Sequence, residues 1–263
     1  MGYDIDRAMS YVMQNGSIME TYKLEFLMEL GRDDKIPLDF FKKYQNKDGG
    51  FCFDLIENRP SAIGTTLSIL PWYHILDVAY TGSFKRCLNY ILETQNPEGY
   101  WDEDAGIQGL NPPEMMIPGV LNTKLYLTSK VSDELIYNNI NEYAAKKGVR
   151  YMEKFMREDG SFEGYPVTNW IMFSVYSQLG EKEKADKLVP SLKASMERDT
   201  KCIIWYLDSI WRAKRENLLA DDLLDILEKS QTEDGNWKTV DGKKHYPAVT
   251  VEAIRVLRTW GRD

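Results

Sequence analysis

The sequence has only three cysteines in 263 residues, Cys52, Cys87 and Cys202, and these are widely spaced. An odd number of distant cysteines makes a framework of disulfide bonds unlikely to be part of the fold. The chain also lacks an excess of basic residues, since its formal net charge at pH 7 is -8. Proteins that bind duplex nucleic acid usually present a basic face, so the charge argues against a nucleic-acid partner.

Long apolar runs are missing as well. No segment approaches the roughly 18 uninterrupted apolar residues of a membrane-spanning helix, and the acidic N-terminus has no apolar signal-peptide core. No run of β-branched residues alternates with period two, so no sheet is expected. These absences together predict a cytoplasmic, all-α protein without an integral membrane segment.

One short motif occurs repeatedly along the chain. Its clearest copy is Gln95–Trp101, and further copies are Gln45–Phe51, Gln231–Trp237 and the more divergent Met156–Phe162. Each copy has glutamine (methionine in the divergent one), glycine four residues later and an aromatic residue two residues after that. Self-similarity at such intervals is typical of a repeat architecture.

Between the motifs, apolar residues recur with the helical period. Ser61 is expected to cap one helix, Pro71 to kink or end it, and Pro118 to lie near the first turn of the helix that begins near residue 113. The predicted helices are 4–14, 17–30, 37–44, 61–70, 83–94, 113–127, 139–157, 166–179, 182–196, 199–214, 219–230 and 247–260.

The second helix of each predicted pair is apolar all round, as in Trp170–Tyr176. A helix that is hydrophobic on every face must be buried on every face. Six hairpins with an inner and an outer ring of helices satisfy this, which predicts an (α/α)6 toroid over a single domain, residues 1–263. An open solenoid is the alternative, but it would leave one side of the inner helices in water.

The spacing of Tyr90, Gln95, Gly99 and Trp101 resembles the QW motif of squalene and terpenoid cyclases, and equally the repeats of protein prenyltransferase β subunits. The resemblance implies that the glutamine caps a neighbouring helix and that the glycine adopts a positive φ. It also implies an isoprenoid or other apolar ligand in a central cavity. The motif therefore specifies the fold more closely than the chemistry.

Class II cyclases of this superfamily protonate an alkene with an Asp-x-Asp-Asp motif, whose acid must be buried and hydrogen-bonded because an ordinary carboxyl is ionised at pH 7. The full motif is absent here. Asp104, in the acidic loop 102–104, and Glu114, after a proline pair, are candidate acids. Asp199 is the third, although Arg198 stands where the resemblance would place the proton donor. For Asp104 a solvated loop, and for Glu114 a favourable helix N-terminus, are the structural alternatives.

Prenyltransferases of the same superfamily bind zinc through Asp, Cys and His. The resemblance suggests Asp199, Cys202 and His245 as a low-probability zinc set, in which the first two share a helix face. The Asp–Cys spacing departs from the family pattern, and Pro247 follows Tyr246 near the histidine. Without zinc, no cofactor is expected.

Aromatic residues on the inner helices are core residues or, in a cyclase-like cavity, ligand contacts whose π faces stabilise carbocations. Basic residues near the same helix starts could bind a diphosphate. The candidate substrate-binding residues are Tyr22, Trp72, Trp101, Trp170, Tyr176, Trp205, Tyr206, Arg198 and Lys201.

Three functions remain open at this point. The first is a terpene cyclase-like enzyme that carries out an acid-assisted cyclisation or isomerisation of an isoprenoid or other apolar small molecule. The second is a non-catalytic toroid that binds a lipid or a protein segment. The third is a zinc-dependent prenyltransferase-like enzyme with a partner subunit.

Overall fold

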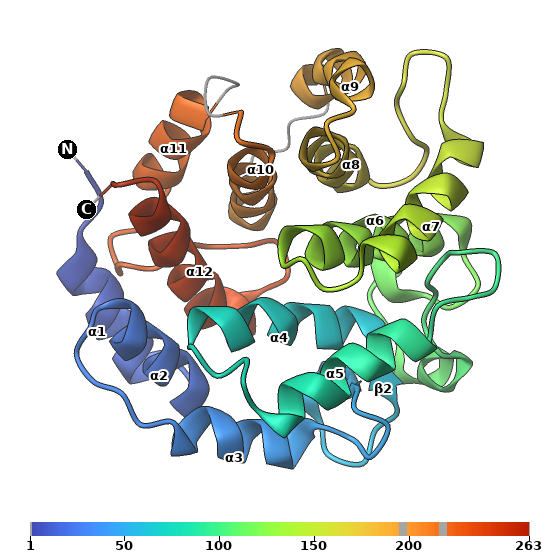
Figure 1. Ribbon diagram of the computed structural model, residues 1–263. Coiled ribbons are helices and arrows are strands. Elements are labelled where there is room, and N and C mark those ends of the chain that lie inside the picture. Colours follow the sequence, from blue (N-terminus) through green and yellow to red (C-terminus); the bar gives the residue numbers. More distant parts are fainter. Residues whose placement is uncertain (1, 195–198, 216–219, 263) are drawn as a thin grey trace. The chain divides into compact units, whose positions relative to one another are not determined.

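The computed structural model describes residues 2–194, 199–215 and 220–262, and these are mostly helical (Figure 1). Twelve α-helices lie in the described residues. They are α1 (Ile5–Asn15), α2 (Ile18–Leu27), α3 (Lys35–Tyr44), α4 (Ile63–Ile75), α5 (Gly82–Glu93), α6 (Leu121–Tyr137), α7 (Glu142–Met152), α8 (Pro166–Gln178), α9 (Lys182–Ala194), α10 (Thr200–Ala213), α11 (Ala220–Lys229) and α12 (Tyr246–Thr259).

The chain forms two compact units. Unit 1 consists of Met1–Pro37 and Met196–Asp263, and unit 2 of Leu38–Ser195. In unit 2, the even-numbered helices α4, α6 and α8 contact one another in succession, and each packs on the odd-numbered helix that follows it. In unit 1, α12 contacts both α10 and α2, while α11 and α1 pack against this row. We call the even-numbered helices inner and the odd-numbered helices outer.

The inner helix α8 is buried as its composition predicts. Every residue of α8 from Val167 to Tyr176 is buried. The outer helix α7 is instead amphipathic, with a buried stripe that includes Ala145 and Val149 and an exposed charged face. This difference between the two kinds of helix lies within unit 2 and follows from hydrophobic patterning alone.

The repeated motif acts as a joint between one outer helix and the next. The Gln95 side-chain amide donates to the carbonyl oxygens of Gly99 and Ala144, each at 2.9 Å, so it links its own turn to the start of α7. Gln45 does the same with the carbonyl of Ser83 in α5, at 2.9 Å. Burial in the turn and saturated hydrogen bonds explain why the glutamine is repeated.

The joint at Gln231–Trp237 contacts the start of the first helix, α1. The Gln231 amide donates to the Asp4 carbonyl at 2.8 Å, and the Asp4 backbone N–H donates back to Gln231 Oε1 at 2.6 Å. The glycine of this joint, Gly235, has a φ of 86° and lies so close to Arg7 that an added Cβ would be 2.5 Å from its carbonyl oxygen. The positive φ of the glycine is thus confirmed. The glutamine does contact the start of the neighbouring helix, but mainly by donating to a carbonyl oxygen there and not by capping its free N–H groups.

Some local predictions are wrong. Pro71 does not end its helix, since it lies inside α4, which continues to Ile75. A proline removes one hydrogen bond, but most residues of α4 are buried and their packing holds the helix. The region from residue 113 to 120 is not the start of α6. Pro118 forces the preceding Ile117 into an extended conformation (ψ 118°), and Gly119 has a φ of 81°.

The cap of α4 also differs from the prediction. The N-cap residue is Ala62, which has no side-chain acceptor, while the Ser61 hydroxyl donates to Asp48 at 2.7 Å. Ser61 and Ala62 form a strand, β2, that pairs antiparallel with β1 (Phe51–Cys52), so a two-stranded sheet is present where none was expected.

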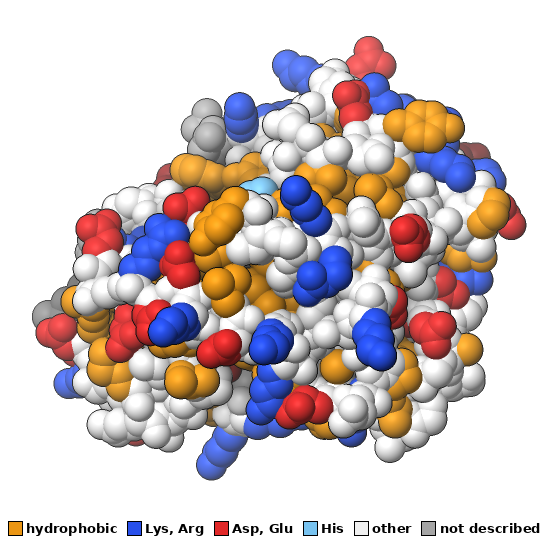
Figure 2. All heavy atoms as spheres, turned by 60° about the horizontal axis from the view of Figure 1, so that its bottom comes forward, with side chains coloured by type: hydrophobic (Ala, Val, Ile, Leu, Met, Phe, Trp, Pro, Cys, Tyr) orange, Lys and Arg blue, Asp and Glu red, His pale blue; other side chains and the backbone are white. Residues whose placement is uncertain are grey.

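The predicted helix ends at residue 196 and near residue 219 fall outside the described residues. Within the described residues, no helix is long and apolar enough to span a membrane. Figure 2 shows positive and negative side chains interspersed on one face, with hydrophobic side chains between them. This face therefore presents no field of a single sign.

Candidate functional site

Trp101, the aromatic residue of the second motif, fixes the chain that follows it. Its ring N–H donates to the Ile91 carbonyl at 2.7 Å, and its backbone N–H donates to the Thr128 hydroxyl on α6 at 3.0 Å. Asp102 then accepts from the backbone N–H of Gly119 at 3.0 Å. These contacts hold the segment after Trp101 against the N-terminal end of α6.

The next residue, Glu103, is only 5% exposed. Its Oε2 accepts the backbone N–H of Ile63 and its Oε1 that of Gly64, both at 2.8 Å. These are the first two residues of α4, whose N-cap has no acceptor of its own. Glu103 therefore caps α4 from about 40 residues away in the sequence, and it places a carboxyl group where a helix N-terminus favours negative charge.

Two opposing effects act on the pKa of Glu103. Burial removes the charged form from water and raises the pKa, and the two backbone hydrogen bonds lower it. The carboxylates of Asp102 and Asp104 on either side raise it further. Burial dominates, so the pKa rises from 4.5 to about 7. A substantial fraction of Glu103 is therefore protonated at neutral pH, as an acid catalyst requires.

Two tyrosines of the neighbouring inner helices extend the site. Tyr126 of α6 is close enough to Glu103 that the carboxylate, together with burial, raises the pKa of its phenol. The ring of Tyr165, at the start of α8, meets the ring of Tyr126 edge-on with centroids 6.3 Å apart. The carboxyl group thus lies near Tyr126, whose ring contacts that of Tyr165. We call Glu103, Tyr126 and Tyr165 the Glu103 site.

The long segment between α5 and α6 covers the site. It contains two short 3-10 helices, η2 (Ala105–Leu110) and η3 (Glu114–Met116). The Met116 side chain lies against Gly64, where an added Cβ would be 2.8 Å from Met116 Cε and 3.0 Å from Glu103 Oε1. The same segment packs on the sheet through a small apolar cluster of Phe53, Ala62 and Ile107, with Leu110 and Met116 at its edge.

Two of the predicted acids lie near the Glu103 site without being buried. Asp104 is exposed and caps η2, where its Oδ1 accepts the Gly106 N–H at 2.7 Å. Glu114 is also exposed, at the start of η3, and its charge helps to raise the pKa of Tyr165 after the larger effect of burial. Of Glu103, Asp104 and Glu114, only Glu103 is therefore buried.

The third predicted acid, Asp199, is in unit 1 and is the N-cap of α10. Its Oδ1 accepts the Lys201 N–H at 3.1 Å, and its Oδ2 accepts the Val240 N–H at 3.0 Å. One carboxylate oxygen thus caps α10, and the other accepts a hydrogen bond from the loop that contains Val240. In the part of the chain that the structure describes, no three His, Cys, Asp or Glu side chains form a group that could hold a metal ion. Asp199, Cys202 and His245 accordingly do not fit a zinc site.

Most of the aromatic residues predicted to bind substrate are buried in the packing of their helices. Trp205 and Lys201 are half-buried, with the Lys201 ammonium 5.0 Å from the ring centroid of Trp205 and 2.7 Å from Asp241. Arg198 lies outside the described residues. The buried ones are Tyr22, Trp72, Trp101, Trp170, Tyr176 and Tyr206, each at most 2% exposed.

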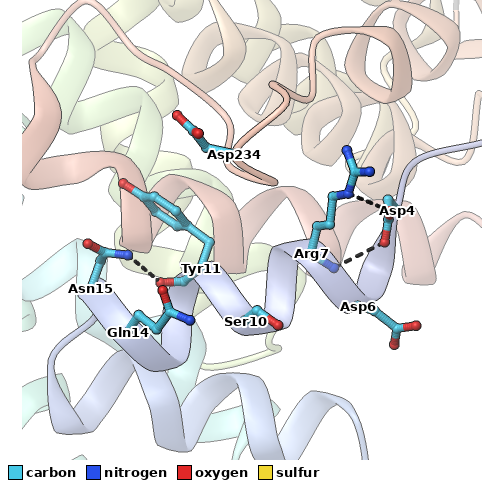
Figure 3. A pocket seen from close by; sticks show the side chains of 8 residues that line it. All are labelled: Asp4, Asp6, Arg7, Ser10, Tyr11, Gln14, Asn15 and Asp234. Atoms are coloured by element: carbon cyan, nitrogen blue, oxygen red, sulfur yellow. Dashed lines mark hydrogen bonds and ion pairs between the residues drawn. The ribbon is translucent and has the colours of Figure 1, made fainter.

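A separate hollow of about 520 Å³ lies on the surface of unit 1, along α1 (Figure 3). Its polar groups bond to one another: Arg7 pairs with Asp4 at 3.1 Å, and the Asn15 amide donates to the Tyr11 carbonyl at 2.9 Å. The hollow is lined by Asp4, Asp6, Arg7, Ser10, Tyr11, Gln14, Asn15 and Asp234. Every residue in this lining is polar or charged apart from the ring of Tyr11, and the acids among them lie at the surface, so we place the candidate site at Glu103.

Glu103 is not among the acids that the sequence predicts, because nothing in the acidic loop 102–104 shows which of its side chains turns inward. Glu103 caps a helix formed earlier in the chain, and such a cap has no local signature. One signal was present: the segment before α4 offers Ser61 and Ala62, and once Ser61 bonds to Asp48, α4 needs an acceptor from elsewhere.

No family model and no curated protein matches the sequence. Among solved structures, the chain is similar to the type II terpene cyclase MstE from Scytonema in its apo form, with a TM-score of 0.61 and 10% identity over 98% of this chain and 98% of that one. MstE in complex with geranylgeranyl dihydroxybenzoate, named as its substrate, gives 0.59 and 11% over 96% and 94%. MstE with merosterolic acid A, named as its product, gives 0.59 and 11% over 97% and 96%. This likeness shows the fold, and it confirms the predicted all-α, terpene cyclase-like fold class.

Proposed function

We propose that the chain is a terpene cyclase-like enzyme that binds an isoprenoid or other apolar small molecule and uses Glu103 as the acid for a cyclisation or isomerisation. The observation that carries the proposal is the buried Glu103 carboxyl with its two backbone hydrogen bonds. The fold shared with MstE supports it, since that protein binds a geranylgeranylated substrate. In this proposal the acid is Glu103 and not Asp104, Glu114 or Asp199.

The arrangement suits both halves of a proton transfer. Burial keeps the carboxyl group protonated at a pH where an exposed glutamate is ionised. Once the proton has moved to a substrate alkene, the N–H groups of Ile63 and Gly64 stabilise the carboxylate that remains. The faces of Tyr126 and Tyr165 would stabilise the carbocation by a cation–π interaction of roughly 0.5–2 kcal/mol each.

The test uses the substrate named for MstE and geranylgeranyl diphosphate as probes, with products separated by liquid chromatography and mass spectrometry. We expect Glu103→Gln to lower kcat by roughly 10²-fold or more, as the removal of a general acid does. Asp104→Asn, which changes the exposed neighbour, should stay within about threefold. The rate of the native enzyme should fall as the pH rises through about 7, because only protonated Glu103 donates. A Glu103→Gln variant with the native rate would overturn the assignment.

A second candidate function is a non-catalytic binding protein for an apolar ligand or a protein segment. The observation in its favour is that Glu103 already has a structural role as the cap of α4. Native mass spectrometry with each probe shows whether the probe binds, and liquid chromatography of the released compound then separates the two functions. A bound probe that is recovered unchanged after long incubation would favour the binding protein, and an isomer of equal mass but different retention time would favour the cyclase.

A further inference from the structure

The position of the Glu103 carboxyl depends on the segment that carries it, because α4, the helix that it caps, lies about 40 residues earlier in the chain. We call residues 103–119 the covering segment. It contains three prolines and three glycines, and its regular structure is limited to the short helices η2 and η3. Such a segment has many alternative paths in solution, and fixing one of them costs conformational entropy. Contacts at its ends therefore matter for where Glu103 lies.

Asp102 accepts hydrogen bonds from both ends of the covering segment. Its Oδ1 accepts the Glu103 N–H at 2.9 Å, and the Gly119 N–H lies 3.2 Å from Oδ1 and 3.0 Å from Oδ2. Asp102 and Gly119 are 17 positions apart in the sequence. Because one carboxylate binds both backbone groups, it closes the covering segment into a loop at its base.

Asp102 is also connected to helix α6. The Lys124 ammonium, in the first turn of that helix, is 3.7 Å from Asp102 Oδ2 and 4.9 Å from the ring centroid of Tyr100. The side chains of the ion pair are only 20% (Asp102) and 23% (Lys124) exposed, which limits screening by water. The residue before Asp102, Trp101, bonds to Thr128 of the same helix. The base of the covering segment is therefore held on a helix and not on another loop.

Asp104, on the other side of Glu103, makes a different kind of contact. Its side chain is exposed, and its Oδ1 accepts the N–H of Gly106, two residues later, at 2.7 Å. Within the part of the chain that the structure describes, this bond is local and caps η2. The two aspartates thus have the same charge and are both adjacent to Glu103, but only Asp102 joins the two ends of the covering segment.

We propose that Asp102 is the positioning residue of the Glu103 site: it holds the base of the covering segment and thereby keeps the Glu103 carboxyl at the start of α4. This role rests on the proposed function, in which Glu103 is the acid. A general acid must lie within hydrogen-bonding reach of the atom that it protonates, and a misplacement of about 1 Å can cost roughly 10²-fold in rate. Asp102 therefore acts on turnover through the place of Glu103, and the proton comes from Glu103 itself.

The first experiment measures kcat and KM of full-length variants with the two probes named above. We expect Asp102→Ala to lower kcat by roughly 10–100-fold with KM within about twofold of the native value, because a misplaced acid slows the chemical step. Asp102→Asn keeps an acceptor for the Glu103 N–H, so its kcat should stay within about fivefold. The matched control, Asp104→Ala, should stay within about threefold. A loss confined to KM, or an Asp102→Asn rate as low as that of Asp102→Ala, would overturn the proposal.

The second experiment does not depend on turnover. Hydrogen exchange followed by NMR reports on the amides of Ile63 and Gly64, which donate to Glu103. The reference is the amide of Ala144, which donates to the N-cap side chain of α7 at 3.0 Å. Relative to this reference, we expect both amides to exchange at least about fivefold faster in Asp102→Ala, because their acceptor is less firmly held. An unchanged ratio in folded Asp102→Ala would overturn the proposal.

Two further comparisons keep the test decisive. If Asp102→Ala does not fold, Lys124→Met removes the ion pair with α6 and leaves the carboxylate in place. The exchange ratios should then rise at least about twofold, and no rise would overturn the proposal. If the native chain turns over neither probe, the proposed function fails while the exchange ratios still test Asp102. If turnover requires Glu103 but Asp102→Ala has native exchange ratios, only the positioning role fails.

Discussion

The joints at Gln95 and Met156, both in unit 2, have the same turn but differ in the side-chain contact that links the turn to the next outer helix. In both, a backbone N–H closes the turn, from Asn96 to the Tyr100 carbonyl and from Arg157 to the Ser161 carbonyl, each at 2.8 Å. The intact joint adds the amide of Gln95, which binds the start of α7. The divergent joint has Met156 at that position, and its link to the next outer helix is an ion pair between Lys184 of α9 and Glu153.

The difference indicates which part of the motif the fold depends on most. The glycine is retained in both joints, with a φ of 109° at Gly99 and 84° at Gly160. The glutamine is replaceable because another polar link can form nearby. The turn therefore sets the path of the chain, and the side-chain contact adds stability to a path already determined. The following tests separate these contributions.

The largest expected effect comes from the glycines. An alanine at Gly99 would place its Cβ 2.5 Å from the Lys147 carbonyl oxygen, which belongs to helix backbone, whereas one at Gly160 would meet the Lys187 side chain at 2.8 Å. We expect Gly99→Ala to lower the free energy of unfolding by about 3–5 kcal/mol and Gly160→Ala by about 1–2 kcal/mol. Urea unfolding followed by circular dichroism measures both, and equal losses would show that the two turns are equally constrained.

The second test compares the pH dependence of stability at Glu103, after the intact joint, and at Glu163, after the divergent joint. Glu103 has a pKa raised above its ordinary value of 4.5 to about 7, so its folded state binds a proton that the unfolded state has lost. The resulting stability is complete below about pH 4.5 and is lost as the pH rises through 7.

Between pH 5 and pH 8 the native chain should therefore lose about 2–3 kcal/mol relative to Glu103→Gln. Glu163, after the divergent joint, is exposed, and Glu163→Gln is the matched control that should follow the native pH dependence. Urea unfolding at the two pH values, with all three proteins, gives the comparison. Parallel curves for native protein and Glu103→Gln would exclude a raised pKa.

Exchanging the first residue of each joint isolates the amide. Gln95→Met removes two hydrogen bonds and leaves the carbonyl of Ala144 without this donor, so a loss of about 1–2 kcal/mol is expected. Met156→Gln should change the free energy of unfolding by no more than about 0.5 kcal/mol, since the ion pair already makes the link. A gain of a full kcal/mol in Met156→Gln would instead mean that the divergent joint retains unused acceptors.

The smallest effect belongs to the ion pair of the divergent joint. Both side chains are about one-third exposed, Lys184 at 37% and Glu153 at 29%. We expect Glu153→Gln to cost about 0.5 kcal/mol at low salt and less in 1 M NaCl, because water and ions screen such pairs. Gln95→Met should lose the same amount at both salt concentrations. Thermal unfolding at the two salt concentrations checks this contrast.

The sequence predicts the fold class well because its information is local and repeated. The motif at Gln95 and the apolar faces of helices such as α8 are each contained in one short, continuous segment of the chain. The prolines are less informative. Pro71 lies inside α4, where packing holds the helix, whereas Pro118 lies before α6 and holds the preceding Ile117 in an extended conformation.

The candidate site was only partly predictable. The sequence predicts an acid in the stretch after Trp101, at Asp104, whereas the buried side chain of this stretch is Glu103. The choice depends on which side chain turns toward α4, a helix formed about 40 residues earlier. Likewise, the sequence predicts Asp199 as an acid at a helix start, yet its two oxygens accept hydrogen bonds from the backbone N–H groups of Lys201 and Val240. Long-range hydrogen bonds decide both cases, and a single sequence does not show them.

The reciprocal bonds between Gln231 and Asp4 affect the order in which the molecule is assembled. The two residues are 227 positions apart, so this joint closes the largest loop of any hydrogen bond described above. During synthesis, α1 leaves the ribosome long before Gln231 exists, and its neighbour α12 follows only at the end. Unit 2, whose joints span at most 49 residues, can fold first. The joint that holds α1 therefore forms only after the C-terminal part of the chain has been made. In hydrogen-exchange experiments on fragments, the amides of α1 should be unprotected until residue 231 is present.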